Sequence, residues 1–361
     1  MNWRIIRETS ASRPASVTGT AGWASNRRVL RPSFFLAAAA VVLPVFAQQE
    51  PDSPLLRANV PLVLAPVTVT DRKGDLIDGL TVDDFRLTDE GAPQKIRMDT
   101  SDTVLAPVSL VVLIQASGIS APALARIERV GGLIKPLVIG ERGQAAVIEF
   151  DDELRLRTDF TADSGAIRAA FEGTRSRSIR TARLIDAVAE GVRMLDTRAA
   201  NHRRVLLILS ESRDRGSKMK LAEAVELAQR AGVVVYPATY SVQASTFASS
   251  ARDAPSMPAQ NDTVDILGGA VELARIGKAN VADTLARATG GRHLSFVTAG
   301  GLENVISRAG EEIHSQYLLS FAPAQRDTVH DKPARFHQIQ VTVPSRPDAV
   351  IRVRQGYWPN K

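Results

Sequence analysis

Two hydrophobic patterns, one typical of buried strands and one of amphipathic helices, alternate along residues 106–322 of this chain. Residues 108–114 form a continuous apolar run, which is typical of a strand buried on both faces of a parallel sheet. Further strands are predicted at 144–150, 204–209, 233–236 and 293–297, and helices at 121–135, 185–195, 221–231, 281–288 and 302–313. This alternation predicts an α/β fold with a doubly wound, mainly parallel sheet, whose binding crevice lies at the carboxyl ends of the strands.

The two flanks of this region have the period-two pattern of β-strands. Branched residues alternate at 62–70, a turn follows at 71–75, and period-two runs return at 337–343 and 350–354. We expect the N-terminal β segment, 55–105, to pair with the C-terminal β segment, 323–361, as a small β module that flanks the α/β domain at 106–322. Inside that domain, the Ser/Ala/Pro-rich stretch 243–260 is predicted to be a mobile surface loop, either functional or a tolerated insertion.

The first 47 residues have the composition of an export signal. The apolar run 34–47 follows several arginines, ends in Val45-Phe46-Ala47 and precedes a short polar spacer at 48–54. The run is shorter than the roughly 20 apolar residues of a membrane-spanning helix. We therefore expect cleavage after Ala47, no stable membrane span afterwards, and a periplasmic or extracellular protein. An uncleaved anchor is the alternative, and Arg27-Arg28 raises the twin-arginine route.

The net charge of +6 is concentrated in this leader. Residues 1–47 contain six arginines and one glutamate, a charge of +5, so the rest of the chain carries only +1. Such a surface has no general excess of cations to neutralise phosphates, which argues against a nucleic-acid partner. The absence of cysteine agrees with an exported protein that folds without disulfides, but it does not decide the compartment.

Enzyme signatures are absent from the sequence. There is no Gly-x-Ser-x-Gly elbow, no His-Glu-x-x-His, no phosphate loop and no dinucleotide-binding glycine motif after a strand. The five histidines are scattered without metal-ligand spacing. Ser117 lies at a strand-to-helix turn, as a nucleophile would, but no base can be identified for it. We therefore expect a protein that is not an enzyme.

Two strand ends carry polar side chains that resemble a known adhesion site. The first strand runs into Gln115-Ala-Ser117-Gly-Ile119-Ser120, and a later strand runs into Glu211-Ser-Arg-Asp214. These segments resemble the metal-ion-dependent adhesion site of von Willebrand factor A (VWA) domains, where an Asp-x-Ser-x-Ser loop, a threonine and a further aspartate meet at one end of a parallel sheet.

The flanking segments extend the resemblance over almost the whole chain after the leader. They are Gly79-Leu-Thr-x-x-Asp84-Phe85, Tyr317-Leu-Leu-Ser-Phe321 and Gly356-Tyr357-Trp358-Pro359, and together with the export signal their order resembles the VWA-related proteins of Acidobacteria. The resemblance implies an exported α/β domain with a binding role and no assigned reaction.

The metal ligands of the family pattern are largely replaced here. Gln115 stands at the aspartate position, Ile119 at the second serine, Ala182 at the threonine and Glu211 at the later aspartate, while Ser117 is kept. Mg²⁺ requires octahedral oxygen ligands and carboxylate charge, so this loss should weaken cation binding severely. We expect a degenerate site with no metal or other cofactor. A one-residue slip that brings in Ser120 and Thr181 is the alternative, and Mg²⁺ or Mn²⁺ could then bind.

The same residues also have a structural interpretation. Gln115 can hydrogen-bond across the strand end, Ser117 can cap the following helix, and Glu211 can pair with Arg213 or Arg215. The predicted function is an exported VWA-like binding protein that engages another protein, independently of cations, through the degenerate adhesion-site positions Gln115, Ser117, Ser120, Thr181, Glu211 and Asp214. Two alternatives remain open: a structural module of the cell envelope that makes contacts through its β segments, and metal-dependent adhesion by the rebuilt site.

Overall fold

The computed structural model describes residues 62–98, 106–118, 121–177, 179–199, 201–211, 213–240, 280–296, 299–323 and 335–359. The chain divides into two units, Met1–Arg57 and Ala58–Lys361, and the described residues all belong to the second. The predicted export signal, the spacer, Ser120 and the loop 243–260 lie outside the described residues. Within the described part, none of the helices combines the length and apolar character needed to cross a membrane.

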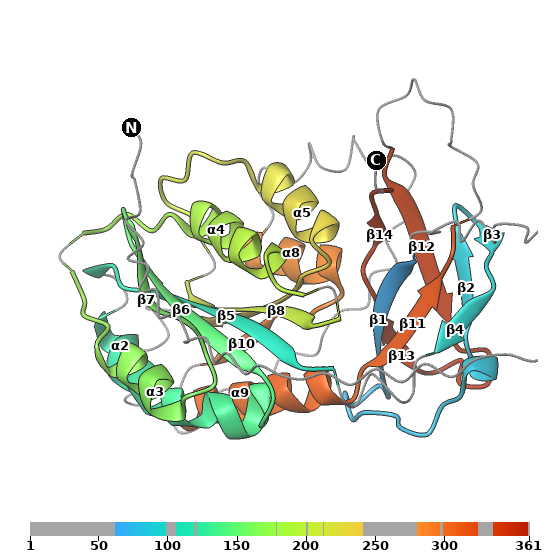
Figure 1. Ribbon diagram of the computed structural model, residues 1–361, viewed down its shortest axis with the longest axis horizontal. Coiled ribbons are helices and arrows are strands. Elements are labelled where there is room, and N and C mark those ends of the chain that lie inside the picture. The colour runs from blue at the N-terminus through green and yellow to red at the C-terminus, as the bar shows by residue number, and fades with distance from the viewer. Residues whose placement is uncertain are drawn as a thin grey trace, which may run out of the picture. The chain divides into compact units, whose positions relative to one another are not determined.

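A six-stranded sheet forms the centre of the α/β domain, in the order β10-β9-β8-β5-β6-β7 (Figure 1). Its strands are β5 (Val108–Gln115), β6 (Gln144–Phe150), β7 (Leu154–Thr161), β8 (Arg203–Ser210), β9 (Val234–Tyr240) and β10 (Leu294–Phe296). Neighbours pair in parallel except β6 and β7, which are antiparallel. Numbered along the chain, the strands follow the order 3-2-1-4-5-6 of doubly wound sheets. The predicted fold class is confirmed.

Helices cover both faces of this sheet. One face packs against α2 (Ala121–Val130), the short helices η3 (Gly131–Leu133) and η4 (Lys135–Ile139), α3 (Ser164–Glu172) and α9 (Ala299–His314). The other face packs against α4 (Leu184–Asp196), α5 (Leu221–Arg230) and α8 (Val281–Thr289). In β5, Leu110, Val112 and Ile114 face the first layer while Val111 and Leu113 face the second, so burial on both sides explains the unbroken apolar run.

The flanking β segments form the predicted module from two four-stranded sheets. Their orders are β13-β1-β11-β4 and β14-β12-β2-β3. The strands are β1 (Val63–Thr70), β2 (Arg86–Asp89), β3 (Ala92–Pro93), β4 (Ile96–Met98), β11 (Tyr317–Phe321), β12 (His337–Thr342), β13 (Val350–Arg352) and β14 (Gly356–Tyr357), and η1 (Val82–Asp84) is a short helix before β2. N- and C-terminal segments pair directly, since β12 lies beside β2 and β13 beside β1. Both sheets share one apolar core.

Two features differ from the sequence pattern. Strand β11, inside the range predicted for the α/β domain, pairs with β1 and β4 of the module. Its apolar run contributes Leu319 and Phe321 to the core of the module, and an apolar run alone does not reveal which core it joins. The antiparallel edge strand β7 and helix α3 are additional elements. An edge strand has one neighbour, and the residues of β7 are accordingly partly buried or exposed.

Candidate functional site

The candidate site lies where the strand order of the six-stranded sheet reverses. Strands β5 and β8 are neighbours at the centre of the sheet, and the following chain leaves them toward opposite faces. In doubly wound sheets this switch point opens a crevice at the carboxyl ends of the strands. Parallel strands end at the same edge of a sheet. Four segments therefore meet there: the loop after β5, the turn 151–153 and the loops 174–183 and 211–220. The described candidate residues, Gln115, Ser117, Thr181, Glu211 and Asp214, lie at this edge.

Gln115 joins the ends of β5 and β8 through its side-chain amide. The residue is fully buried, its Oε1 accepts a hydrogen bond from the backbone N–H of Glu211 at 3.0 Å, and its Nε2 donates to Ser117 Oγ at 2.8 Å. A backbone N–H can only donate, so the atom that faces Glu211 is the oxygen and the amino group must face Ser117. The position of the expected aspartate thus holds a group that is both donor and acceptor.

The loop after β5 is fixed by backbone hydrogen bonds on both sides. Ala116 N donates to Phe150 O at 2.8 Å, Arg177 N donates to Ala116 O at 3.0 Å, and Gly118 N donates to Ile179 O at 2.7 Å. Ser117 is buried completely and bridges Arg177 in parallel register. The loop 174–183 is therefore attached directly to the end of the central strand.

The loop after β8 joins the same network. Glu211 is 9% exposed, and its Oε2 accepts from Arg215 Nη2 at 3.3 Å. Burial raises the pKa of Glu211, and the charges of Arg215 and Arg213 offset this only in part. Ala182, at the expected threonine position, exchanges two backbone hydrogen bonds with Arg215, at 3.0 and 2.8 Å. The loops 174–183 and 211–220 are thereby held together.

Asp214 serves the start of a helix. Its Oδ1 accepts from Ile185 N at 3.1 Å and from Ser217 Oγ at 2.5 Å, so the carboxylate satisfies a free N–H in the first turn of α4. Asp186 makes the reciprocal contact from α4 to the loop, because its carboxylate accepts hydrogen bonds from the backbone N–H groups of Lys218 and Met219. Burial alone would raise the pKa of Asp186, but these hydrogen bonds and Arg183 lower it overall. The two carboxylates cross-link the loop to α4.

Sequence reasoning missed two buried carboxylates beside the crevice. Glu149 and Asp151, at and just beyond the end of β6, are both fully buried. Arg177 Nη2 lies 2.9 Å from Glu149 Oε1, and Arg155 Nη1 lies 2.8 Å from Asp151 Oδ1. Burial would raise the pKa of Asp151, yet the Glu153 N–H and Arg155 lower it overall. The signal in the sequence was an acidic residue near the end of the apolar run 144–150. Guanidinium groups therefore neutralise these two buried carboxylates.

The described residues of the crevice do not fit a divalent cation. Mg²⁺ needs oxygen lone pairs, whereas Gln115 directs its amino group toward Ser117, Glu211 is paired with Arg215, and Asp214 is engaged by α4. Within the described part of the chain, no group of three or more His, Cys, Asp or Glu is arranged to hold a metal ion. Thr181 is partly exposed, and its proposed companion Ser120 lies outside the described residues.

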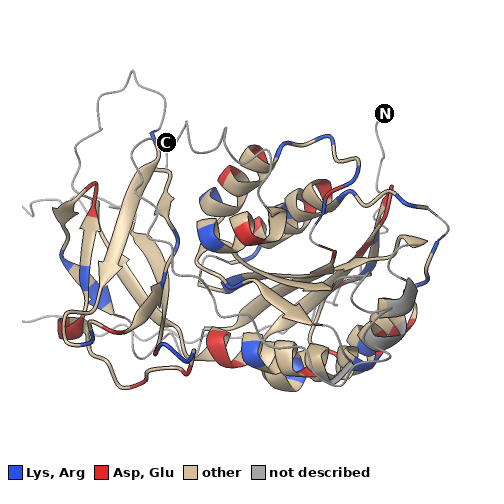
Figure 2. Ribbon diagram, turned by 180° about the vertical axis from the view of Figure 1, so that it is seen from behind, with Lys and Arg blue, Asp and Glu red and all other residues tan. Residues whose placement is uncertain are grey.

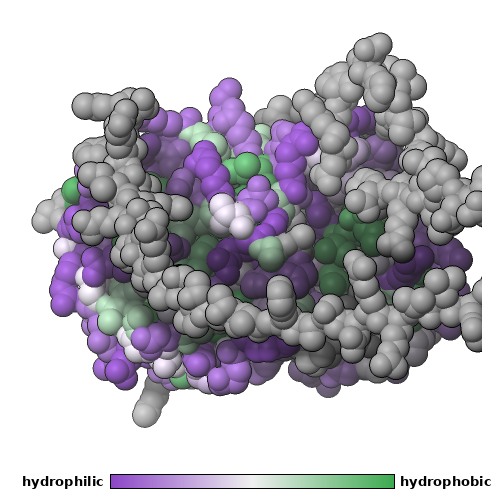
Figure 3. Space-filling view, in the orientation of Figure 1, coloured by the Kyte–Doolittle hydropathy of each residue, from purple (hydrophilic) through white to green (hydrophobic). Residues whose placement is uncertain are grey.

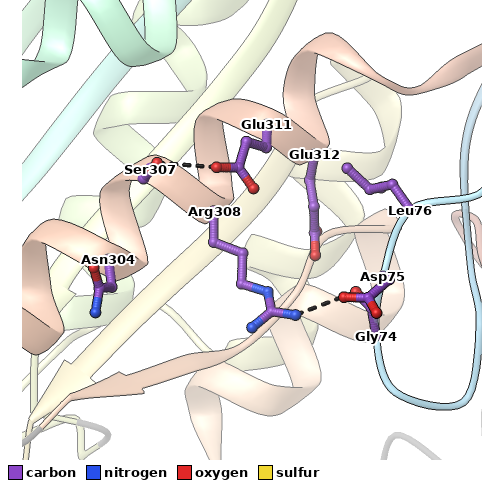
Figure 4. A pocket seen from close by; sticks show the side chains of 8 residues that line it. All are labelled: Gly74, Asp75, Leu76, Asn304, Ser307, Arg308, Glu311 and Glu312. Carbon is purple, nitrogen blue, oxygen red and sulfur yellow. Dashed lines mark hydrogen bonds between the residues drawn. The ribbon is translucent and has the colours of Figure 1, made fainter.

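A separate cavity of about 360 Å³ lies between the turn after β1 and helix α9 (Figure 4). Gly74, Asp75 and Leu76 line it from the turn, and Asn304, Ser307, Arg308, Glu311 and Glu312 line it from the helix. Arg308 Nη2 donates to Gly74 O at 3.2 Å, and Ser307 Oγ donates to Glu311 Oε1 at 3.0 Å. Arg308 and Glu311 already have partners within the protein, and Glu312 pairs with Arg292 and Arg352, so this cavity is a weaker candidate than the carboxyl edge of the sheet.

Comparison with solved structures finds similar folds. They include an aerotolerance-related membrane protein from Bacteroides fragilis (13% identity, 57% of this chain and 99% of that chain covered, TM-score 0.41). A von Willebrand factor type A protein from Catenulispora acidiphila is 11% identical, with 71% of this chain and 51% of that chain covered and a TM-score of 0.43. The SpRpn10 VWA domain is 10% identical, with 56% and 94% covered and a TM-score of 0.33. These likenesses concern the fold alone.

No family model matches this sequence, and no curated protein matches it either. The structural neighbours nevertheless include VWA domains, the family that the sequence resembles. The molecule is an α/β protein with a doubly wound sheet and a flanking β module.

Proposed function

We propose that this protein binds another protein at the carboxyl end of its six-stranded sheet, without a cation and without catalysing a reaction. The observation that carries the proposal is that the Gln115 amide forms two hydrogen bonds at the switch point. It donates to Ser117 Oγ and accepts from the Glu211 N–H, so both groups have a partner within the protein. A crevice bridged in this way needs no metal to stabilise it. Its rim of loops is still displayed at the edge where doubly wound folds bind their ligands.

The proposal includes export. The leader 1–47 has the charged and apolar regions of an export signal, so the binding would take place in the periplasm or outside the cell. The absence of cysteine suits such a location but does not require it.

Cation independence is tested by thermal unfolding in EDTA and then in millimolar Mg²⁺, Mn²⁺ or Ca²⁺. A cation present at about a hundred times its dissociation constant would stabilise the fold by about 2.7 kcal/mol, a shift of several degrees. We expect no shift. A shift that is lost in Thr181→Ala would instead support metal-dependent adhesion by the rebuilt site, with Ser120→Ala as the second variant.

Protein binding is tested by photo-crosslinking in cells that express the full chain. Benzoylphenylalanine is placed at Ser176, which is exposed in the loop 174–183, and in parallel at Lys95, which is exposed between β3 and β4. We expect a discrete protein adduct from position 176 and none from position 95. The reverse result would support the alternative of a structural module that makes contacts through its β segments. The exposed side chains of Leu62 and Leu64 at the start of β1 are the observation in favour of that alternative.

A further inference from the structure

We propose that the loops at the carboxyl edge of the sheet recognise an acidic segment of the partner protein through arginine and lysine side chains. This inference rests on the proposed function and adds the chemistry of the partner.

The two loops that frame the crevice are strongly basic. Residues 174–183 contain four arginines and no acidic residue, and residues 211–220 contain two arginines and two lysines against Glu211 and Asp214. The basic residues are Arg175, Arg177, Arg180, Arg183, Arg213, Arg215, Lys218 and Lys220. Outside the leader the chain carries a net charge of only +1, so this local excess is a property of the site and not of the whole surface. Figure 2 shows blue segments along the loops at this end of the sheet.

Half of these cations already form ion pairs within the protein. Arg177 pairs with Glu149, Arg183 with Asp186, Arg215 with Glu211, and Arg175 lies 3.4 Å from Glu128. The other four are exposed: Arg180, Arg213, Lys218 and Lys220. None of them forms an ion pair with a residue in the described part of the chain. These four arginines are therefore already engaged within the protein, and the outer ring, Arg180, Arg213, Lys218 and Lys220, is left to interact with charges from outside.

The backbone of the two loops that bear the outer ring is held in place by contacts between the loops. The paired hydrogen bonds between Ala182 and Arg215 join the two loops. Gly216 approaches Thr181 so closely that a Cβ at position 216 would lie 2.9 Å from Thr181 Cγ2. Because Arg180 and Arg213 each lie two residues from this junction, their backbone positions are set before a partner arrives. Ordering costs less free energy on such a preorganised surface than on a loose loop.

The chemistry of the two loops favours an acidic protein segment. Large exposed hydrophobic side chains in the described part of the chain are Leu62, Leu64 and Leu156, which all lie outside both loops. On the face shown in Figure 3, hydrophilic residues cover most of the visible described surface and the hydrophobic areas are small. Guanidinium groups match the planar geometry of carboxylates. Neither loop contains an aromatic residue, whereas proteins that bind single-stranded nucleic acids stack bases on aromatic side chains.

The test uses the full chain and a fluorescent oligoglutamate peptide of about ten residues, with oligoglutamine of the same length as the neutral probe. Fluorescence anisotropy is measured at about 0.05 and about 0.3 M salt, since screening weakens interactions between exposed charges. The test variant is Arg180→Glu with Arg213→Glu. The matched control is Arg97→Glu with Arg346→Glu, which reverses two exposed arginines of the β module and changes the net charge equally.

We expect salt-sensitive binding of oligoglutamate, at least about tenfold weaker in the test variant and nearly unchanged in the control. Equal losses in both variants would overturn the inference, because net charge alone would then explain binding. Oligothymidylate that binds as tightly as oligoglutamate would overturn it in favour of a general polyanion site. No preference for oligoglutamate over oligoglutamine would also overturn it. If position 176 still crosslinks to a protein in that last case, the proposed binding function stands and only the acidic partner is wrong.

Discussion

Gln115 hydrogen-bonds Glu211 across the point where the strand order of the sheet reverses. The Gln115 Oε1 accepts a hydrogen bond from the Glu211 N–H at 3.0 Å. This bond joins the ends of β5 and β8, although the two residues are 96 positions apart in the sequence. The amino group of the same amide donates to Ser117. This amide therefore bridges the ends of the two strands by hydrogen bonds.

Replacing Gln115 with alanine should therefore destabilise the protein. The variant leaves the buried Glu211 N–H without its acceptor and creates a small cavity, and the expected loss in the free energy of unfolding is about 1–3 kcal/mol. Urea denaturation measures this loss. Gln94→Ala is the matched control, because Gln94 is partly exposed and donates to Ala92 O within the same turn, and this change should cost no more than about 0.5 kcal/mol. Equal losses at both positions would contradict the bridging role.

Glu211 should make stability depend on pH. Burial, only partly offset by Arg215 and Arg213, raises the pKa of Glu211 above its ordinary value of 4.5. The folded protein then holds this proton more tightly than the unfolded chain, so the contribution of Glu211 to stability falls as the pH rises from 4.5 through the raised pKa. Glu211→Gln removes this dependence, and the variant should gain stability relative to the wild type as the pH rises through that window.

The measurement is urea denaturation of the wild type and Glu211→Gln at a series of pH values. Glu226→Gln serves as the control, because Glu226 pairs with Arg230 on the exposed surface of α5. If the curves of the wild type and Glu211→Gln run parallel throughout the window, the raised pKa is refuted.

Gly216 should not tolerate a side chain. Its φ is +105°, a conformation that favours glycine, and a Cβ there would lie 2.9 Å from Thr181 Cγ2. We expect Gly216→Ala to cost about 1–3 kcal/mol in thermal or urea unfolding. Gly79→Ala separates the two causes, because Gly79 has a φ of +80° but a Cβ at this position would meet no atom within 4 Å. Adding Thr181→Ala to Gly216→Ala should recover the part of the loss that comes from the methyl contact, and no recovery would rule that contact out.

Arg354 links the C-terminal β segment to helix α5 by hydrogen bonds. It is 9% exposed, its Nη2 donates to Gln229 O in the last turn of α5, and its Nε donates to Gly356 O at 2.7 Å. Burial lowers the pKa of Arg354 to about 10, and the partial negative charge at the carboxyl end of a helix favours a cation there. Trp358 Nε1 donates to Gln229 Oε1 at 3.3 Å beside this contact.

Arg354→Met should therefore cost at least about 2 kcal/mol, because two buried carbonyl groups lose a charged donor while most of the side-chain volume is kept. Urea denaturation provides the measurement. Arg346→Ala, at an exposed turn of the β module, should change stability by no more than about 0.5 kcal/mol. A loss at Arg354→Met no larger than this would show that the hydrogen bonds of Arg354 contribute little.

The sequence by itself determined the fold class, most helices and strands, and the strand ends that carry the candidate residues. These features follow from local periodicity, because a strand such as β5 that is buried on both faces must be apolar throughout. The same reasoning paired the two flanking β segments. It also recognised that Gln115 could hydrogen-bond across the strand end and that Glu211 could pair with a nearby arginine.

Only the tertiary structure decided how the charges and hydrogen bonds are distributed. Glu149 pairs with Arg177, 28 residues later, and Gln115 bridges to Glu211 because strands distant in the chain end side by side. It also decided that β11 joins the β module and that β7 runs antiparallel at the edge of the sheet. Hydrophobic periodicity is a local property of the chain, whereas the partner of a polar side chain depends on which distant segment packs against it.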